Sequence, residues 1–277
     1  MLAVSRVRSA GACGCLSRVP VDLSEPERDL VVGRLRAAGC VFAEEEAALL
    51  LAEAPASEAL EEMVARRVAG QPLEQVVGWA QFRGARMHVG QGVFVPRLRT
   101  ELLVELAMPL LAAGRTVLDL CCGTGAVGAA LAREVPGIEV YAADVDPAAV
   151  ACARRNLPAA RVFEGDLYAA LPGALRGRVD VLAVNAPYVP TDEIALMPAE
   201  ARDHEHLVAL DGGADGLDVQ RRVVACAREW LAPSGHLLIE TSVRQAPVTL
   251  ALFVAAGLEA RVEHSEEYDA TVVVGAA

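Results

Sequence analysis

Segments typical of strands and helices alternate from Thr100 to the end of the chain, and this alternation constrains the fold more than any other feature of the sequence. Short apolar runs predict buried strands, and stretches with apolar residues three or four apart predict helices between them. The expected strands are 116–120, 138–142, 160–163, 179–184, 235–240, 259–264 and 270–275, and the expected helices are 101–112, 125–133, 147–156, 217–231 and 245–256. Such a pattern predicts an α/β domain over 100–277, with a mostly parallel seven-stranded sheet and helices on both faces. Ligands of these sheets bind beyond the carboxyl ends of the strands.

The residues before this domain follow a different pattern. Ser24-Glu25-Pro26-Glu27 predicts a helix start, with a serine cap and a glutamate three residues later. That helix and two more, over 44–54 and 57–69, predict a small helical domain over 24–72, which we interpret as a substrate-recognition domain. Residues 1–23 show little periodicity and are expected to form an extension, which could be disordered.

A β-hairpin linker is expected over 73–99. Its short apolar runs, which glycines separate, predict strands at 76–78, 82–84, 87–89 and 93–95.

Composition restricts the class of protein. Hydrophobic residues make up 54% of the 277 residues, which predicts a large buried core. The net charge of −12 argues against a nucleic-acid substrate, since proteins that grip phosphate backbones usually carry a basic surface. No apolar run reaches the roughly 18 residues of a membrane span, and no secretory core follows the first residues, so we expect a cytoplasmic protein without membrane contact.

The seven cysteines are odd in number and lack paired spacing, which predicts reduced thiols. No cysteine or histidine pairs have metal-ligand spacing, so we expect no metal.

A loop of small residues follows the first expected strand of the α/β domain. Glycines at such a place let a ligand approach the backbone and the amino end of the next helix. On its own this loop is weak evidence, since several classes of nucleotide enzyme have one. The candidate cofactor-binding residues here are Asp119, Cys121, Cys122, Gly123, Thr124 and Gly125.

Acidic residues end the next two strands. Asp144 is expected to accept hydrogen bonds from the ribose hydroxyls of an adenosine ligand, with Val145 beside it. Asp146 directly precedes Pro147 at a helix start and is therefore expected to be the N-cap. Asp166 and Leu167 follow the third strand, where they could face the amino group and ring of adenine.

The fourth strand ends in Asn185-Ala186-Pro187-Tyr188, and here the sequence resembles the class I methyltransferases with an Asn-Pro-Pro-Tyr tetrapeptide. More narrowly, it resembles the release factor glutamine N5-methyltransferases over roughly residues 28–275. The supporting segments are Phe82-x-Gly84, Val95-Pro96-Arg97-x-x-Thr100-Glu101, the loop 119–125, Leu210-Asp211-Gly212-Gly213, Asp215-Gly216-Leu217, and Glu240 with Gln245.

The resemblance implies a class I, Rossmann-like fold with S-adenosylmethionine as cofactor and S-adenosylhomocysteine as product. It also implies a protein substrate, namely a glutamine such as that of the Gly-Gly-Gln loop of a translation termination factor. Arg97, Thr100 and Glu101 then become candidate substrate-binding residues, together with Asn185, Pro187 and Tyr188.

The chemistry of amide methylation fits the tetrapeptide. An amide nitrogen is a poor nucleophile, and a site can help by accepting hydrogen bonds from both N–H groups. The side-chain carbonyl of Asn185 and the main-chain carbonyl of Ala186 are the expected acceptors; Pro187 stiffens the turn and Tyr188 packs on the planar group. The sulfonium donor is already activated, so the reaction requires positioning and no general base, and we nominate no histidine.

Four features depart from the family pattern. Ala186 replaces the first proline of the tetrapeptide, Leu98 and Arg99 replace a proline and an acidic residue, and Thr241-Ser242 replaces an apolar residue and glycine. Cys121-Cys122 stands where relatives have glycine and a small residue. These departures leave the methyl-transfer residues in place and indicate a divergent branch.

Several alternatives remain open at this point. They are glutamine methylation of another protein such as a ribosomal protein, N6-adenine methylation of DNA or RNA, a nicotinamide-dependent oxidoreductase, and a cofactor-binding protein without catalysis. The oxidoreductase would leave residues 185–188 unexplained, and the loop after 119 lacks the Gly-x-Gly-x-x-Gly register.

Overall fold

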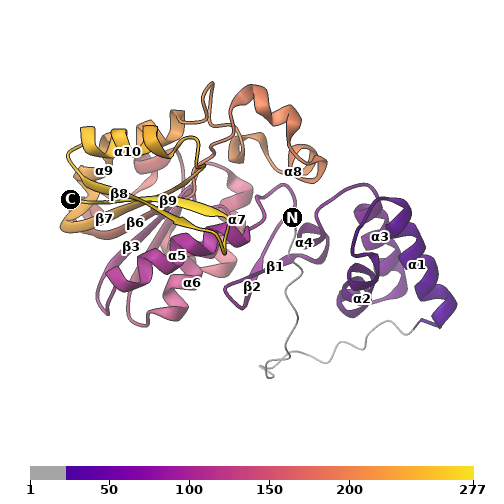
Figure 1. Ribbon diagram of the computed structural model, residues 1–277. Coiled ribbons are helices and arrows are strands. Elements are labelled where there is room, and N and C mark those ends of the chain that lie inside the picture. The colour runs from indigo at the N-terminus through magenta and orange to yellow at the C-terminus, as the bar shows by residue number, and fades with distance from the viewer. Residues whose placement is uncertain (1–22) are drawn as a thin grey trace. The chain divides into compact units, whose positions relative to one another are not determined.

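The computed structural model describes residues 23–277, and the chain divides into two units, 1–69 and 70–277 (Figure 1). The expected extension over 1–23 therefore lies, apart from Leu23, outside the described residues. The linker 73–99 belongs to the second unit, together with the sheet.

The first unit contains three helices, α1 (Glu25–Ala37), α2 (Ala43–Glu53) and α3 (Ser57–Val68). The predicted start of α1 is confirmed, because the Glu27 carboxylate accepts hydrogen bonds from the backbone nitrogen and hydroxyl of Ser24 at 2.9 and 2.6 Å. Fully buried Leu35, Leu50 and Val64 join the three helices in one core.

The second unit begins with α4 (Leu73–Val77) and a hairpin of β1 (Trp79–Phe82) and β2 (Ala85–His88). Two of the expected linker strands, 76–78 and 93–95, are wrong, and a third, 82–84, is misplaced, since only Phe82 belongs to β1 and Arg83-Gly84 form the turn before β2. Residues 76–78 form the end of α4, because Pro72 precedes the helix and Gly78, at φ +84°, terminates it.

Residues 93–95 also pair with no strand. Side chains satisfy their backbone instead, since Val93 accepts a hydrogen bond from Gln75 and Val95 donates one to Glu205.

The predicted seven-stranded sheet is confirmed. Its strands lie in the order β5-β4-β3-β6-β7-β9-β8; only the pairs β7–β9 and β9–β8 are antiparallel. The strands are β3 (Thr116–Leu120), β4 (Glu139–Asp144), β5 (Val162–Glu164), β6 (Val179–Val184), β7 (Leu231–Thr241), β8 (Glu259–Ser265) and β9 (Ala270–Ala276).

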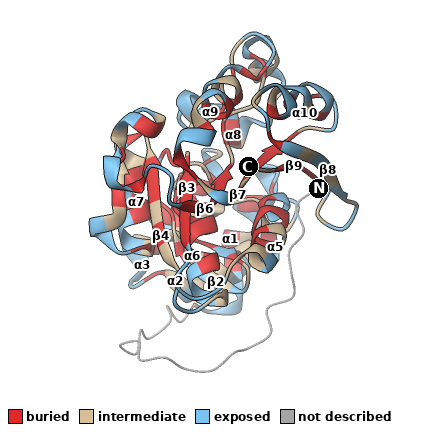
Figure 2. Cartoon of the chain, turned by 90° about the vertical axis from the view of Figure 1, so that its left-hand side faces the viewer, coloured by how far each residue is buried: buried red, intermediate tan, exposed pale blue. Residues whose placement is uncertain are grey.

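Helices cover both faces of this sheet (Figure 1). One face carries α5 (Glu101–Ala107), α6 (Ala126–Glu134) and α7 (Pro147–Asn156), and the other carries α9 (Asp218–Trp230) and α10 (Ala246–Ala255). Successive residues of β3 point to opposite faces, so Val117 packs in the core under α5 and α6 and Leu118 in the core under α9 and α10. Each fully buried leucine or valine contributes roughly 2 kcal/mol, and Figure 2 shows these buried residues concentrated along the strands.

The chain leaves β3 toward β4 on one side, while β6 pairs with β3 on the other. This reversal of direction places a crevice outside the carboxyl ends of the two strands. A short helix that the pattern did not predict, α8 (Ala199–His204), lies in the long connection after β6. Within residues 23–277, no helix is both long and apolar enough to span a membrane.

Candidate active site

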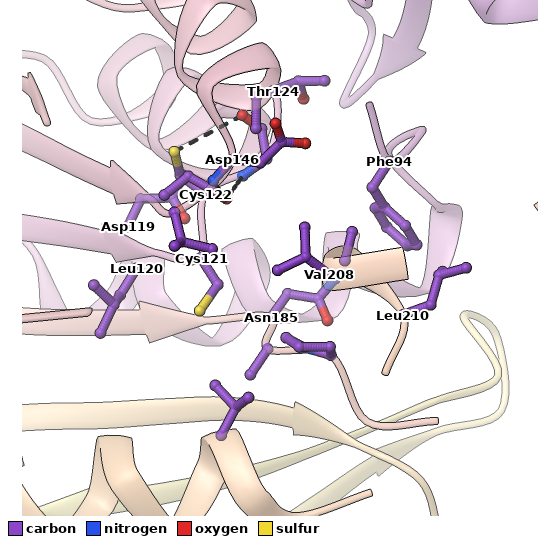
Figure 3. A pocket seen from close by; sticks show the side chains of 18 of the residues that line it. Phe94, Asp119, Leu120, Cys121, Cys122, Thr124, Asp146, Asn185, Val208 and Leu210 are labelled. Carbon is purple, nitrogen blue, oxygen red and sulfur yellow. Dashed lines mark hydrogen bonds between the residues drawn. The ribbon is translucent and has the colours of Figure 1, made fainter. Parts of the chain in front are cut away.

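A cavity of about 500 Å³ opens at the carboxyl ends of β3, β4, β5 and β6. Figure 3 shows the loop after β3 along one side of it and Asn185 on another. The predicted site residues that line it are Arg97, Thr100, Asp119, Cys121, Cys122, Gly123, Thr124, Asp144, Val145, Asp166, Leu167, Asn185, Ala186, Pro187 and Tyr188. Gly125 and Glu101 are the two predicted residues outside this lining.

The loop after β3 has an unusual backbone. Cys121, Gly123 and Gly125 all have positive φ values, of 58°, 54° and 73°. Space is open where Gly123 would carry a Cβ, so a ligand can approach its backbone. Gly125 has another role, because a Cβ there would lie 2.9 Å from Leu157 and 3.2 Å from Ala153, where α7 packs.

Asp119 is buried beneath this loop, with an exposed fraction of 2%. Its carboxyl oxygen accepts a hydrogen bond of 2.8 Å from the backbone nitrogen of Gly128 in α6. Burial raises the pKa of Asp119 to about 7, against the opposing effect of this hydrogen bond. Asp119 thus ties the start of α6 to the end of β3.

Asp144 and Asp146, at the end of β4, make different hydrogen bonds. The N-cap is confirmed, because Asp146 Oδ1 accepts a hydrogen bond of 2.9 Å from Ala148. Asp144 accepts hydrogen bonds from Gly123 at 2.8 Å and from Asp146 at 2.9 Å, one on each carboxyl oxygen. Burial raises the pKa of Asp144, and the two backbone hydrogen bonds oppose the rise.

Asp166 and Leu167 line the cavity directly after β5. The exposed Asp166 carboxylate pairs with Arg222 of α9 at 2.6 Å. Leu167 holds a positive φ of 49° and lines the wall.

Four interactions hold the tetrapeptide. Asn185 Nδ2 donates a hydrogen bond of 3.1 Å to the hydroxyl of Thr100. The Tyr188 hydroxyl donates to Glu240 at 3.4 Å and accepts from Arg99 at 3.3 Å, and the Tyr188 carbonyl accepts from Gln245 Nε2 at 2.9 Å. Burial and the nearby Glu240 raise the pKa of Tyr188 to about 12, so its hydroxyl stays protonated at neutral pH.

The connection after β6 forms the cavity wall opposite the loop after β3, residues 121–125, which we call the glycine loop. Glu205, exposed by 5%, accepts hydrogen bonds from Val95 at 3.0 Å and from the Arg97 guanidinium at 2.6 Å. Nδ1 of His206 lies 2.7 Å from Asp146 Oδ2, which joins this connection to the start of α7. None of these three contacts has a local sequence signal, since the partners lie 110, 108 and 60 residues apart.

The sequence also did not identify several apolar wall residues. Phe94, Met197, Val208 and Leu210 line the cavity across from the glycine loop (Figure 3 labels three of them). Glu101 lies elsewhere and accepts a hydrogen bond of 3.0 Å from the backbone nitrogen of Arg83, in the turn between β1 and β2.

The cysteines and histidines add no further site. The five described cysteines, Cys40, Cys121, Cys122, Cys152 and Cys226, are free, while Cys13 and Cys15 lie outside the described residues. No group of three or more potential metal ligands lies together within 23–277.

The arrangement fits an adenosine-containing methyl donor. The open backbone at Gly123, the Asp144 carboxyl and the side chains of Leu167 and Asn185 line the same cavity.

Comparisons with known proteins agree with this geometry. Residues 88–201 match the model of the methyltransferase small domain family. A release factor glutamine methyltransferase of Geobacter sulfurreducens is 38% identical over 199 residues, which span 70% of this chain and 69% of that protein.

Two further proteins are similar to this chain, one of them named for a different substrate and the other similar in fold. A 4-amino-L-phenylalanine/4-methylamino-L-phenylalanine methyltransferase of Streptomyces pristinaespiralis is 38% identical over 203 residues, which span 70% of this chain and 69% of that protein. The crystal structure of a methyltransferase from Pyrococcus furiosus superposes with a TM-score of 0.54 over 78% of this chain and 98% of that one; at 15% identity it shows the shared fold.

Proposed function

Because this chain belongs to the family of the release factor glutamine methyltransferases, we propose that it transfers the methyl group of S-adenosylmethionine to the side-chain nitrogen of a glutamine in a peptide chain release factor. The observation that carries the proposal is that Asn185-Ala186-Pro187-Tyr188 faces the same cavity as Asp144 and the glycine loop. One cavity can therefore hold the donor and the planar amide next to each other.

The residues that would hold the cofactor follow from the cavity wall. The Asp144 carboxyl would accept the ribose hydroxyls, with the backbone of Gly123 beside them. Asp166 and Leu167 would contact the adenine. The bound cofactor supplies an activated methyl group, so no protein nucleophile is required.

The tetrapeptide would orient the substrate amide. The side-chain carbonyl of Asn185 and the main-chain carbonyl of Ala186 accept its two N–H groups, which directs the nitrogen lone pair at the methyl group. Ala186 lines the cavity, and alanine has the same main-chain carbonyl as the proline that it replaces. Tyr188, held by Glu240 and Arg99, packs on the planar group.

Exposed leucines beside the cavity, which we call the apolar rim, support the proposal that the substrate is a protein. Leu98, Leu196 and Leu207 are exposed by 48%, 83% and 58%, and each directly adjoins a residue that lines the cavity. A protein segment bound at the cavity would cover these side chains, and this burial would add affinity. The helical unit over 24–72 would supply further recognition, and a release factor substrate would place the enzyme in the cytoplasm.

One observation favours a second candidate, methylation of an aromatic amine on an amino acid. Arg99 lies at the cavity, where it is exposed and, among the described residues, forms no ion pair within 4 Å, whereas Arg97 and Arg222 are both paired. A guanidinium in this position can bind a substrate carboxylate. The relative from Streptomyces pristinaespiralis acts, by its name, on such a compound.

A direct assay separates these candidates. The purified full-length chain is incubated with methyl-labelled S-adenosylmethionine and, separately, with a release factor, 4-amino-L-phenylalanine, a ribosomal protein fraction and adenine-containing DNA or RNA. We expect label on the release factor alone, located on the glutamine of its Gly-Gly-Gln loop by mass spectrometry. Label on the amino acid would favour the second candidate, and label on another protein or on nucleic acid would overturn both. Asn185→Ala serves as the inactive control.

A further inference from the structure

The side chain of Gln245 joins three segments of the chain at the carboxyl ends of β6 and β7. Its Nε2 group donates hydrogen bonds of 2.9 Å to the backbone carbonyl of Tyr188, in the tetrapeptide, and to that of Asp215, in the loop before α9. Its Oε1 accepts a hydrogen bond of 2.7 Å from the hydroxyl of Ser242, directly after β7. An amide NH₂ group has two hydrogens, so both are used and each end of the amide has a partner.

Burial makes these hydrogen bonds difficult to replace. Gln245 is only 5% exposed, so water has little access to its amide. A buried polar group that loses its partner cannot recover the interaction with water, and the loss costs more than at the surface. The amide of Gln245 therefore holds the carbonyl of Tyr188 at a fixed position relative to the start of α10.

Ser242 holds the Gln245 side chain from the turn that leads into α10. The Ser242 Oγ accepts a hydrogen bond of 3.2 Å from the backbone nitrogen of Gln245, and the Ser242 carbonyl accepts one of 2.9 Å from Ala246. The single hydroxyl hydrogen of Ser242 then remains for Oε1 of Gln245. A glycine at position 242, which is the residue of the family pattern, has no hydroxyl to make this contact.

The space around the hydrogen bond between Gln245 and Tyr188 is closed by a glycine. A Cβ on Gly216 would lie 2.3 Å from Gln245 Nε2 and 2.2 Å from the carbonyl oxygen of Tyr188. Gly216 also has a φ of +76°, a backbone conformation that favours glycine. The absence of a side chain at 216 is therefore a condition for the amide of Gln245 to reach Tyr188.

We propose that Gln245, held by the hydroxyl of Ser242, positions the tetrapeptide by fixing the backbone carbonyl of Tyr188. Gln245 lies outside the cavity lining, so it is a positioning residue that acts through Tyr188. Because Tyr188 is two residues from the Ala186 carbonyl, a displaced Tyr188 backbone would also misplace that acceptor. The inference rests on the proposed function for its catalytic consequence, whereas the hydrogen bond to Tyr188 is a property of the protein alone.

A second buried glutamine provides a matched control. Gln220 of α9 is fully buried, donates a hydrogen bond of 3.4 Å to Thr241 Oγ1 and accepts one of 2.7 Å from the hydroxyl of Thr249. Thr241 and Thr249 both lie outside the tetrapeptide and the cavity lining. The loss of the Gln220 amide should therefore lower stability without moving Tyr188.

The sequence offers a direct spectroscopic test. Tyr188-Val189 is the only Tyr-Val pair among the 277 residues, so ¹³C-carbonyl tyrosine together with ¹⁵N-valine yields one correlated signal, from this peptide bond. Gln245→Met should move the Tyr188 carbonyl resonance upfield, because the carbonyl loses a hydrogen-bond donor. Gln220→Met should leave this resonance in place. An unmoved resonance in Gln245→Met would overturn the proposal.

Kinetics with a glutamine substrate test the catalytic consequence. Gln245→Met should lower kcat by more than about 10-fold, the cost of misplaced groups at the reacting centre, with the KM for S-adenosylmethionine unchanged. Gln220→Met should lower the urea concentration at the midpoint of unfolding and leave kcat alone. Equal kcat values in the two variants would refute the positioning role.

The hydroxyl of Ser242 is tested separately. Ser242→Ala should lower kcat by about 5-fold, which corresponds to the loss of one neutral hydrogen bond, and Ser242→Thr should restore kcat because threonine keeps the hydroxyl. A wild-type kcat in Ser242→Ala would overturn the role of Ser242. If the wild type methylates no glutamine substrate, the proposed function fails, and the Tyr188 carbonyl resonance still decides whether Gln245 fixes the tetrapeptide.

Discussion

The carboxyl of Asp144 accepts a hydrogen bond of 2.8 Å from the backbone nitrogen of Gly123, across the ends of two neighbouring strands. The same Asp144 lines the cavity, so the residue that we propose to bind the ribose also holds the loop after β3. A loss of its carboxyl therefore has two consequences for cofactor binding.

We expect Asp144→Ala to raise the Kd for S-adenosylmethionine by at least about 10-fold, which corresponds to the loss of one or more hydrogen bonds to a charged group. Calorimetry measures this change directly. Asp146→Ala is the matched control, because it removes the N-cap of α7 and should cost about 1 kcal/mol of stability with a smaller change in Kd. An unaltered Kd in Asp144→Ala would remove the ribose assignment.

Asn185→Ala should separate binding from turnover. We expect kcat to fall by at least about 100-fold, since the variant loses the acceptor that orients the substrate amide. The Kd for S-adenosylmethionine should stay close to the wild-type value in calorimetry. Turnover at the wild-type rate would contradict the role of the tetrapeptide.

The tetrapeptide turn depends on a glycine in another segment. Gly216 has a φ of +76°, and a Cβ on it would lie 2.2 Å from the carbonyl oxygen of Tyr188. Gly216→Ala should therefore displace Tyr188 and lower kcat by more than about 10-fold, since small displacements near reacting groups are costly.

Gly84→Ala is the control for this variant, because φ there is +75° with no atom within 4 Å of an added Cβ. It should cost about 1 kcal/mol in a urea unfolding experiment and leave kcat alone. Equal kcat values in the two variants would show that the contact with Tyr188 has no effect.

The raised pKa of Glu240 makes stability depend on pH. Its folded pKa is about 7, above the ordinary value of 4.5, so folding favours the protonated form. The contribution is fully present below pH 4.5 and is lost as the pH rises through 7; it amounts to about 3 kcal/mol. Asp119, whose pKa is also raised to about 7, acts in the same direction.

Urea unfolding of the wild type should show the free energy of unfolding falling between pH 5 and pH 8. Glu240→Gln should reduce this fall, because a glutamine does not titrate. An identical slope in the variant would show that Glu240 titrates at its ordinary pKa.

The apolar rim predicts a selective effect on the protein substrate. Leu196→Glu should raise the KM for a release factor by about 10-fold, which corresponds to a lost buried leucine contact at an interface. The KM for S-adenosylmethionine should not change. Val254→Glu, at a residue of α10 that is exposed by 59%, is the control and should alter neither value. An unchanged KM in Leu196→Glu would exclude the rim from substrate binding.

The sequence predicted local structure well where contacts within a few residues determine it. The strand and helix periodicities located the seven strands and the principal helices, and the caps at Ser24 and Asp146 are where the residue types predicted them. Of the two wrong strands, 76–78 is the end of the short helix that Pro72 and Gly78 delimit, and 93–95 is an apolar segment whose backbone pairs with the side chains of Gln75 and Glu205. Periodicity carries no information about such partners.

By itself, the sequence determined the order of the elements, the positions of the acidic strand ends and the presence of a methyltransferase tetrapeptide. Only the tertiary structure decided that Asp166 pairs with Arg222, that Glu205 and His206 attach the long connection to the cavity wall, and that Asn185 bonds to Thr100. The physical reason is that these side chains are brought together by strand order and helix packing. Their partners lie 50 or more residues apart, beyond the reach of capping and periodicity.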